Sequence, residues 1–317
     1  MSSIHTRRSL LLAAAMTGLA GCAGEQADDD PATASATPTA TPTPTATPTA
    51  EPSPEQAPRY QTPTLTVEPT TGPIAAAFPA QITVFGSRVI APAGVDTATH
   101  RHVAGVLAGF LDADGDGQPD LPAVADALAS VGATVLVVRS EADLERAIDT
   151  LEGGAAPGAF VEVFTDEVHP SGRPHSAGGR FDATVEEVFH LITQFGYARA
   201  FPAVFAEAPG SAIADAMDTA RGGRFETPPA SYPAGAWYTY DDPTCTYDCQ
   251  VTEYTYWVAT TLMGAQADRA SSIDDEWRLA TPTALREGDP AAVAILSDPR
   301  WRLPETVPDG RYPPAAA

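Results

Sequence analysis

The residues best suited to chemistry in this chain lie between Asp182 and Thr193, in the sequence Asp-Ala-Thr-Val-Glu-Glu-Val-Phe-His-Leu-Ile-Thr. Apolar side chains recur in this segment at helical spacing, which predicts an amphipathic helix. Glu186 and His190 stand four residues apart, so they share one face of that helix. A carboxylate and an imidazole placed in this way can bind one metal ion, and Glu187 can hold a water beside it as general base. The pattern predicts a hydrolytic metal site.

This layout resembles the His-Glu-x-x-His helix of zinc metallopeptidases, with Glu186 in place of the first His. Over residues 80–265, the expected order of elements is similar to the catalytic domain of Glu-zincins, especially the lethal-factor-like branch. The resemblance implies a third ligand on a later helix, for which Glu253 is the best candidate. In this interpretation Tyr254 or Tyr256 donates a hydrogen bond to the developing oxyanion. Two carboxylates and an imidazole form a hard ligand set that accepts Zn2+, Fe2+ or Mn2+.

A second interpretation of the same helix needs no metal. Thr184 and Glu187 match a capping box, in which the glutamate reaches back to the start of the helix. Acidic residues in a first turn are also favoured by the helix dipole, and His190 is then an ordinary core histidine. Under this interpretation the protein is a non-catalytic surface lipoprotein with a ligand-binding role. The sequence leaves both interpretations open.

Residues 112–120 form a second candidate metal site of different chemistry. Their sequence, Asp-Ala-Asp-Gly-Asp-Gly-Gln-Pro-Asp, resembles an EF-hand or thrombospondin-type loop between two predicted helices. Oxygen ligands at alternate positions suit Ca2+, and the glycine at position six permits the sharp turn. Ala123 stands where an EF-hand has its bidentate glutamate, so we expect a structural ion of about millimolar affinity. The expected ligands are Asp112, Asp114, Asp116 and Asp120. The alternative is a solvated Asp/Gly turn.

The N-terminal part of the chain predicts export and membrane attachment. A twin-arginine start precedes an apolar run that is too short to span a bilayer, and Leu-Ala-Gly-Cys at 19–22 resembles the lipobox of prokaryotic lipoproteins. The resemblance implies a signal peptide over residues 1–21 and lipidation of Cys22. Residues 22–72 are rich in Thr, Pro, Ala and acidic side chains, which is typical of a disordered linker. We therefore expect an exported, lipid-anchored metallopeptidase-like protein that faces the periplasm or the cell exterior.

The charge of the chain limits the kinds of partner that we expect, and its cysteines predict a disulfide. The chain has 41 acidic and 18 basic side chains, a formal net charge of −23, and contains no lysine. Such a surface repels nucleic acid and anionic lipid, so we expect no nucleic acid partner. The resemblance to metallopeptidases implies a peptide substrate, and we expect a monomer. Besides Cys22, the chain contains Cys245 and Cys249, which are predicted to form a small-loop disulfide outside the cytoplasm. A metal-binding cysteine pair is the alternative.

Residues 73–317 are long enough for one domain with its own core. Apolar patterns predict strands within 81–91, at 133–138 and at 159–164. Helical patterns predict helices at 98–111, 122–131, 141–151, 211–220 and 252–262, with the metal-motif helix ending at Gly196 and the last 40 residues irregular. Because strands precede the metal-motif helix and helices follow it, we expect an α+β, zincin-like domain with a mixed sheet.

Overall fold

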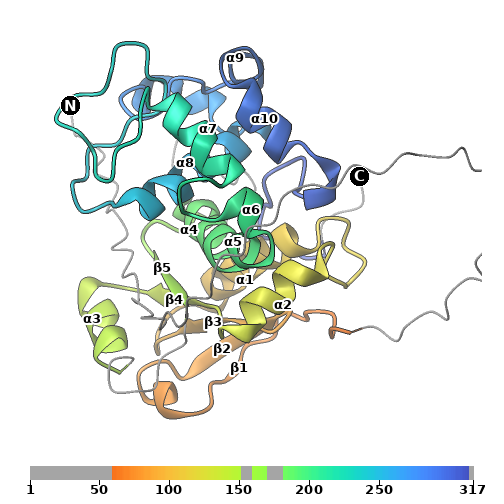
Figure 1. The fold of residues 1–317 in the computed structure, drawn as a ribbon. Helices are drawn as coiled ribbons and strands as arrows, with labels where there is room; N and C mark the ends of the chain where they lie inside the picture. The colour runs from red at the N-terminus through yellow and green to blue at the C-terminus, as the bar shows by residue number, and fades with distance from the viewer. Residues whose placement is uncertain (1–58, 151–158, 170–180, 314–317) are drawn as a thin grey trace, which may run out of the picture. The chain divides into compact units, whose positions relative to one another are not determined.

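The helices of the domain pack against a five-stranded mixed sheet (Figure 1). This computed structural model describes residues 59–150, 159–169 and 181–313. The strands, which neighbour one another in chain order, are β1 (Glu68–Pro69), β2 (Ala80–Val84), β3 (Ser87–Ala91), β4 (Thr134–Val138) and β5 (Phe160–Phe164). β1, β2 and β3 pair antiparallel, whereas β3, β4 and β5 pair parallel. A mixed sheet combined with helices confirms the predicted α+β class.

The helices in the described part of the chain are α1 (Thr97–Leu111), α2 (Pro122–Ser130), α3 (Glu141–Thr150), α4 (Ala183–Leu191), α5 (Ala198–Ala200), α6 (Pro202–Phe205), α7 (Ala212–Ala220), α8 (Tyr247–Leu262), α9 (Pro282–Gly288) and α10 (Pro290–Leu296). Two apolar clusters lie on opposite faces of the sheet, because successive side chains of a strand point to opposite sides. Val137 of β4 packs in the cluster that contains α1, α2 and α4, and Leu136 packs in the cluster that contains α3. β4 is therefore buried along its whole length, as its apolar sequence predicts.

The candidate ligands are carried by two helices in contact. α4 contacts β5 and α1, and α8 contacts α4, α7 and α10 (Figure 1). Glu186 and His190 lie on α4, and Glu253 lies on α8. Cys245 and Cys249 form the predicted disulfide at the start of α8. The C-terminal helices therefore pack onto the metal-motif helix through α8.

The structure corrects two predicted helix limits and the prediction of an irregular C-terminal segment. The helix of His190 does not end at Gly196, because α4 continues into a π-helical segment, Ile192–Tyr197, and then into α5. Gly196 instead permits close packing of α2, since a Cβ at this position would lie 2.8 Å from Cγ1 of Val124. α8 begins at Tyr247, earlier than predicted. The last 40 residues contain α9 and α10, which are too short for a periodic pattern to reveal.

The packed domain begins before the predicted limit at residue 73. The rings of Tyr60 and Phe85 meet edge to face with centroids 6.0 Å apart, and β1 adds a strand to the sheet. The Thr/Pro-rich composition concealed this segment, because backbone pairing of a two-residue strand needs no apolar pattern. The predicted signal peptide, Cys22 and the first part of the predicted linker lie outside the described residues.

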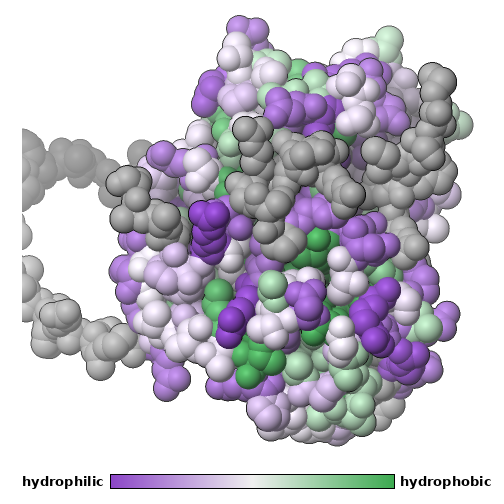
Figure 2. Space-filling model, turned by 180° about the vertical axis from the view of Figure 1, so that it is seen from behind, coloured by the Kyte–Doolittle hydropathy of each residue, from purple (hydrophilic) through white to green (hydrophobic). Residues whose placement is uncertain are grey.

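The described surface is largely hydrophilic on the face shown in Figure 2. Hydrophilic and intermediate residues cover most of the face in Figure 2, with small groups of hydrophobic residues between them. Within residues 59–150, 159–169 and 181–313, no helix combines the length and the hydropathy that crossing a bilayer requires.

Candidate metal centre

The helix that carries two of the candidate ligands begins at a buried aspartate. Asp182 is the N-cap of α4, and its Oδ1 accepts the N–H of Thr184 at 3.1 Å. The capping box that the sequence suggested is therefore wrong, because the cap lies two residues before Thr184. Glu187 instead approaches His190, with its Oε2 3.7 Å from Nδ1 of the imidazole. Asp182 therefore caps the helix, and Glu187 remains available to interact with His190.

Glu186, His190 and Glu253 converge, and we call them the acid–histidine cluster. One ligand atom from each of these side chains lies within 4.8 Å of the other two. α4 supplies the first two from successive turns, and α8 supplies the third. Oε2 of Glu253 lies 3.6 Å from Nε2 of His190. The structure therefore brings together the three ligands proposed from the sequence.

His190 is the least ordinary member of the cluster. Only 1% of its surface is exposed, yet neither ring nitrogen has a hydrogen-bond partner among the described residues. Leaving a buried polar atom unbonded costs about 1 to 3 kcal/mol, so native structures seldom do it without a reason. Burial lowers the pKa of His190, against the opposing charge of Glu253, so the imidazole is neutral at pH 7. A neutral imidazole keeps a lone pair for a metal ion.

The carboxyl group of Glu253 is buried and that of Glu186 is half-buried, and both are crowded by other acids. Burial raises the pKa of Glu186 to about 8; the charge of Glu187 adds to this effect and Arg269 opposes it. Burial likewise raises the pKa of Glu253 to about 8, although His190 opposes the shift. A divalent cation at this point would offset the negative charge and allow both carboxyl groups to ionise.

The two tyrosines proposed as oxyanion donors have different surroundings. Tyr254 points away from the cluster, because its hydroxyl donates to Oδ2 of Asp289 at 2.5 Å. It follows Glu253 directly, and one residue turns a helix by about 100°. The structure therefore corrects the prediction for Tyr254. Tyr256 does lie at the cluster, where its hydroxyl forms a hydrogen bond with the carboxyl group of Glu186.

Sequence reasoning missed four polar residues around the cluster, which are Tyr240, Gln266, Arg269 and Glu276. Tyr240 donates to Oε1 of Glu253 at 3.1 Å. Gln266 and Arg269 both hydrogen-bond the hydroxyl of Tyr256. Glu276 adds negative charge beside both carboxyl groups of the cluster. Tyr240 stands in an aromatic run that a sequence can show, but nothing local connects any of the four to α4.

The aspartate loop, residues 112–120, follows α1 as predicted. Carboxylate oxygens of Asp112, Asp114 and Asp116 lie within 4.8 Å of one another. Asp120 is not part of this group, and its Oδ2 accepts the N–H of Ala113 at 2.6 Å. The structure thus assembles three of the four predicted calcium ligands.

Internal hydrogen bonds hold the aspartate loop in shape. The carboxylate of Asp112 is buried and accepts the N–H groups of Asp116 at 3.1 Å and Gly117 at 2.9 Å. It also accepts a hydrogen bond from the hydroxyl of Tyr312. These bonds can fix the conformation of the loop without an ion, which is consistent with the alternative interpretation as an Asp/Gly turn.

A buried histidine–aspartate hydrogen bond connects α1 to the start of α4. Nε2 of His102 lies 2.7 Å from Oδ2 of Asp182, and the two side chains are 4% and 0% exposed. His100 faces a different side of α1, with its Nε2 2.9 Å from the carbonyl oxygen of Val89. The pair holds the residue that caps the metal-motif helix.

Replacing His102 by alanine should lower the free energy of unfolding by about 3 kcal/mol, because it leaves the carboxylate of Asp182 buried without its partner. Urea unfolding followed by circular dichroism measures this loss. Arg101→Ala, at an exposed neighbouring position, is the control and should change the free energy by less than about 0.5 kcal/mol. A loss below 1 kcal/mol for His102→Ala would contradict the importance of the pair.

Glu207 is a partly buried acid outside the cluster. Burial raises its pKa to about 7, although hydrogen bonds from Thr252 and Gln194 oppose the shift. The raised pKa means that the folded protein binds this proton more tightly than the unfolded chain. Ionisation of Glu207 therefore costs stability progressively as the pH rises from about 4.5 to about 7.

Glu207→Gln should remove this cost and make the protein up to about 3 kcal/mol more stable than wild type at pH 8, but not at pH 4, since one pKa unit corresponds to about 1.4 kcal/mol. Urea unfolding of both proteins at the two pH values measures the difference. The exposed Glu287→Gln serves as the control. Parallel pH dependence of wild type and Glu207→Gln would refute the prediction.

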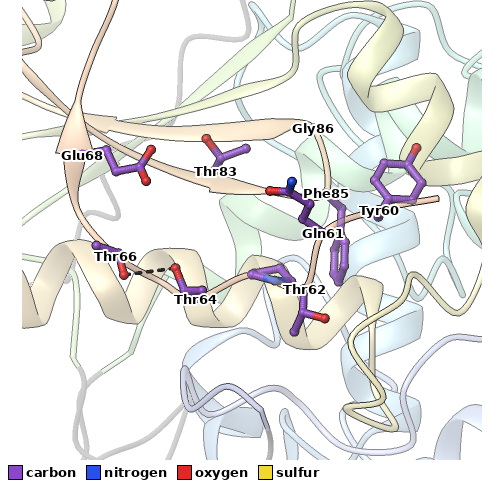
Figure 3. Close-up of a pocket in the computed structure, with 10 residues that line it drawn as sticks. Tyr60, Gln61, Thr62, Thr64, Thr66, Glu68, Thr83, Phe85 and Gly86 are labelled. Atoms are coloured by element: carbon purple, nitrogen blue, oxygen red, sulfur yellow. Dashed lines mark hydrogen bonds between the residues drawn. The ribbon is translucent and has the colours of Figure 1, made fainter. Parts of the chain in front are cut away.

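Two surface pockets are formed by other parts of the domain. One, of about 270 Å3, lies between residues 60–68 and the β2–β3 turn, where the hydroxyls of Thr64 and Thr66 hydrogen-bond at 3.0 Å (Figure 3). The other, of about 580 Å3, is lined by Leu262 and Met263 at the end of α8 and by residues near Leu303. Neither pocket is lined by a residue of the cluster or of the aspartate loop.

The fold and the cluster define an α+β domain with a candidate metal centre between two helices. No protein-family model, no curated protein and no solved structure matches this chain. The resemblances to Glu-zincins and to lipoproteins therefore rest on the motifs themselves, and the function has to be argued from the site.

Proposed function

We propose that this protein is an exported, lipid-anchored hydrolase of the metallopeptidase type, in which Glu186, His190 and Glu253 bind one divalent metal ion. The observation that carries the proposal is the buried imidazole of His190, whose two unbonded nitrogens lie among carboxyl groups. The donor set fits the ion, because two carboxylates and one neutral imidazole bind Zn2+ and also accept Fe2+ or Mn2+. The proposed anchor is a lipid on Cys22.

The residues of the site suit hydrolysis of a peptide bond. A bound divalent cation lowers the pKa of a water and polarises a carbonyl group. Glu187 lies beside the cluster, where its carboxylate can accept a proton from the attacking water and return it to the leaving nitrogen. Tyr256 holds the carboxyl group of Glu186. This division of roles leaves the three ligands to bind the ion and Glu187 to move the proton.

Elemental analysis tests the proposal directly. The full chain, purified without chelator, should contain about one transition-metal ion per molecule. Dialysis against a chelator should remove the ion, and micromolar Zn2+ should restore it. If the full chain contained no transition metal and took up no Zn2+, the proposed metal-dependent hydrolase would be refuted.

The rival function is that of a non-catalytic surface lipoprotein with a structural Ca2+ ion and a ligand-binding role. The grouping of Asp112, Asp114 and Asp116 favours it, because alternate carboxylates in a Gly-rich loop suit a weakly held Ca2+. Titration calorimetry should then show Ca2+ binding at about millimolar concentration. No heat of binding in that range would eliminate this Ca2+ site.

A further inference from the structure

Each carboxyl group of the acid–histidine cluster is hydrogen-bonded by the hydroxyl of a buried tyrosine. Tyr240 donates to Oε1 of Glu253 at 3.1 Å, whereas Oε2 of the same carboxyl group lies 3.6 Å from Nε2 of His190. The tyrosine thus takes one oxygen and leaves the other facing the imidazole. Tyr256 forms the corresponding hydrogen bond with Glu186. Both tyrosines are less than one-tenth exposed, so water does not compete freely for these bonds.

The direction of the hydrogen bond at Tyr256 follows from its other two partners. Oε1 of Gln266 lies 3.3 Å from Nη1 of Arg269 and accepts from it, so the amide Nε2 of Gln266 is the group that donates to Tyr256, at 3.4 Å. Arg269 also hydrogen-bonds the Tyr256 hydroxyl, and a guanidinium has donor groups only. The tyrosine oxygen therefore accepts from both neighbours. Its single hydrogen is left to donate to Glu186.

The guanidinium of Arg269 is itself fixed in place. It lies 4.0 Å from the centre of the Phe181 ring and 5.9 Å from that of Trp257, in cation–π contact. These rings and Gln266 limit the rotation of a side chain that is otherwise long and mobile. The hydrogen bonds to Tyr256 are thereby held in one arrangement.

We infer that Tyr240 and Tyr256 are positioning residues of the metal site, each fixing by hydrogen donation the direction in which one carboxylate ligand presents its oxygens to the ion. The inference rests on the proposed function, because it assigns a role at the same site. Outer-shell groups of this kind orient metal ligands, and their removal typically weakens metal binding by about 10-fold to 100-fold.

The same arrangement explains how a glutamate can occupy position 186. A histidine ligand binds the ion through one nitrogen and needs an acceptor for its other ring N–H, whereas a carboxylate ligand needs donors. Around Glu186 the structure provides a donor, because Gln266 and Arg269 direct the hydroxyl hydrogen of Tyr256 at it. The surroundings of this position are therefore matched to a carboxylate ligand.

Single hydroxyl deletions in the full chain test the inference, with Zn2+ and Co2+ as probes. Tyr240→Phe and Tyr256→Phe should each weaken Zn2+ binding by about 10-fold or more in competition titrations with a chelating dye. The visible absorption of bound Co2+, which depends on the arrangement of its ligands, should change in both variants. Tyr254→Phe is the matched control, because its hydroxyl is equally buried but donates to Asp289. It should keep the wild-type Zn2+ affinity and Co2+ spectrum.

Thermal unfolding without metal establishes that each variant is folded. If Tyr256→Phe does not fold, Arg269→Gln tests the same hydrogen bonds from a half-exposed position and should also weaken Zn2+ binding. Wild-type affinity in the folded Tyr240 and Tyr256 variants would overturn the inference while leaving the three ligands in place. An equal loss in Tyr254→Phe would also overturn it, because general loosening of α8 would then explain the effect. A wild-type chain that binds no Zn2+ would remove the proposed function together with this inference.

Discussion

Replacing His190 by alanine is expected to weaken Zn2+ binding to the full chain by more than about 100-fold. Removing even an outer-shell partner of a metal ligand costs about 10-fold to 100-fold, so losing a ligand should cost more. His190 lies between Glu187 and Glu253, at 3.7 Å and 3.6 Å, and it is the cluster's nitrogen donor. Without the imidazole, one buried and one half-buried carboxyl group remain, and these favour a proton over a weakly held ion.

Competition titration measures this loss, with His169→Ala as the control for removal of an imidazole outside the cluster. The affinity should also depend on pH. Because the pKa values of Glu186 and Glu253 are raised to about 8, the ion must displace protons from them below that pH. Zn2+ affinity should therefore fall from pH 8 to pH 6, by up to about tenfold per pH unit for each proton displaced. Equal affinity of the two histidine variants would contradict the proposed ligand.

Glu187→Gln should lower the turnover number of the Zn2+-loaded full chain by about 100-fold to 10,000-fold while leaving its metal content unchanged. The amide has the size of the carboxylate but cannot accept the proton of an attacking water. Hydrolysis of a mixture of fluorescence-quenched peptides measures turnover, and elemental analysis measures the metal. Glu207→Gln, which alters an acid outside the cluster, is the matched control and should retain wild-type turnover.

Two outcomes would contradict the role of Glu187 as general base, and they can be told apart. Unchanged turnover would show that another group accepts the proton. Metal content and turnover that fall together would show that Glu187 acts through His190, whose Nδ1 lies 3.7 Å from its carboxylate, and holds the ring for metal binding.

Local sequence patterns predicted most of the elements that surround the site. The strands β2 and β3, the helix α1 and the buried strand β4 all follow from apolar periodicity, which depends on neighbouring residues. Prediction failed at Gly196, where a glycine that resembles a helix end lies against Val124 of α2. There, packing between helices outweighed the local preference of the chain.

Helical spacing also predicts which of the two α8 tyrosines lies beside Glu253. Tyr256 lies three residues after Glu253 and shares its helix face, whereas Tyr254 lies one residue after it and faces Asp289. Helical phase alone therefore favours Tyr256 over Tyr254. The same argument does not reach Tyr240 or Arg269, which come from other segments of the chain.

The sequence by itself determined that Glu186, Glu187 and His190 lie on adjacent positions of one helix, because the geometry of an α-helix is set by its own backbone hydrogen bonds. Only the tertiary structure decided that Glu253 meets Glu186 and His190 within 4.8 Å. It also decided that tyrosine hydroxyls hold the carboxyl groups of Glu186 and Glu253. Where α8 crosses α4 depends on the burial of many apolar side chains along both helices. Each of those contacts is weak, and their combined effect cannot be predicted from any short segment of the sequence.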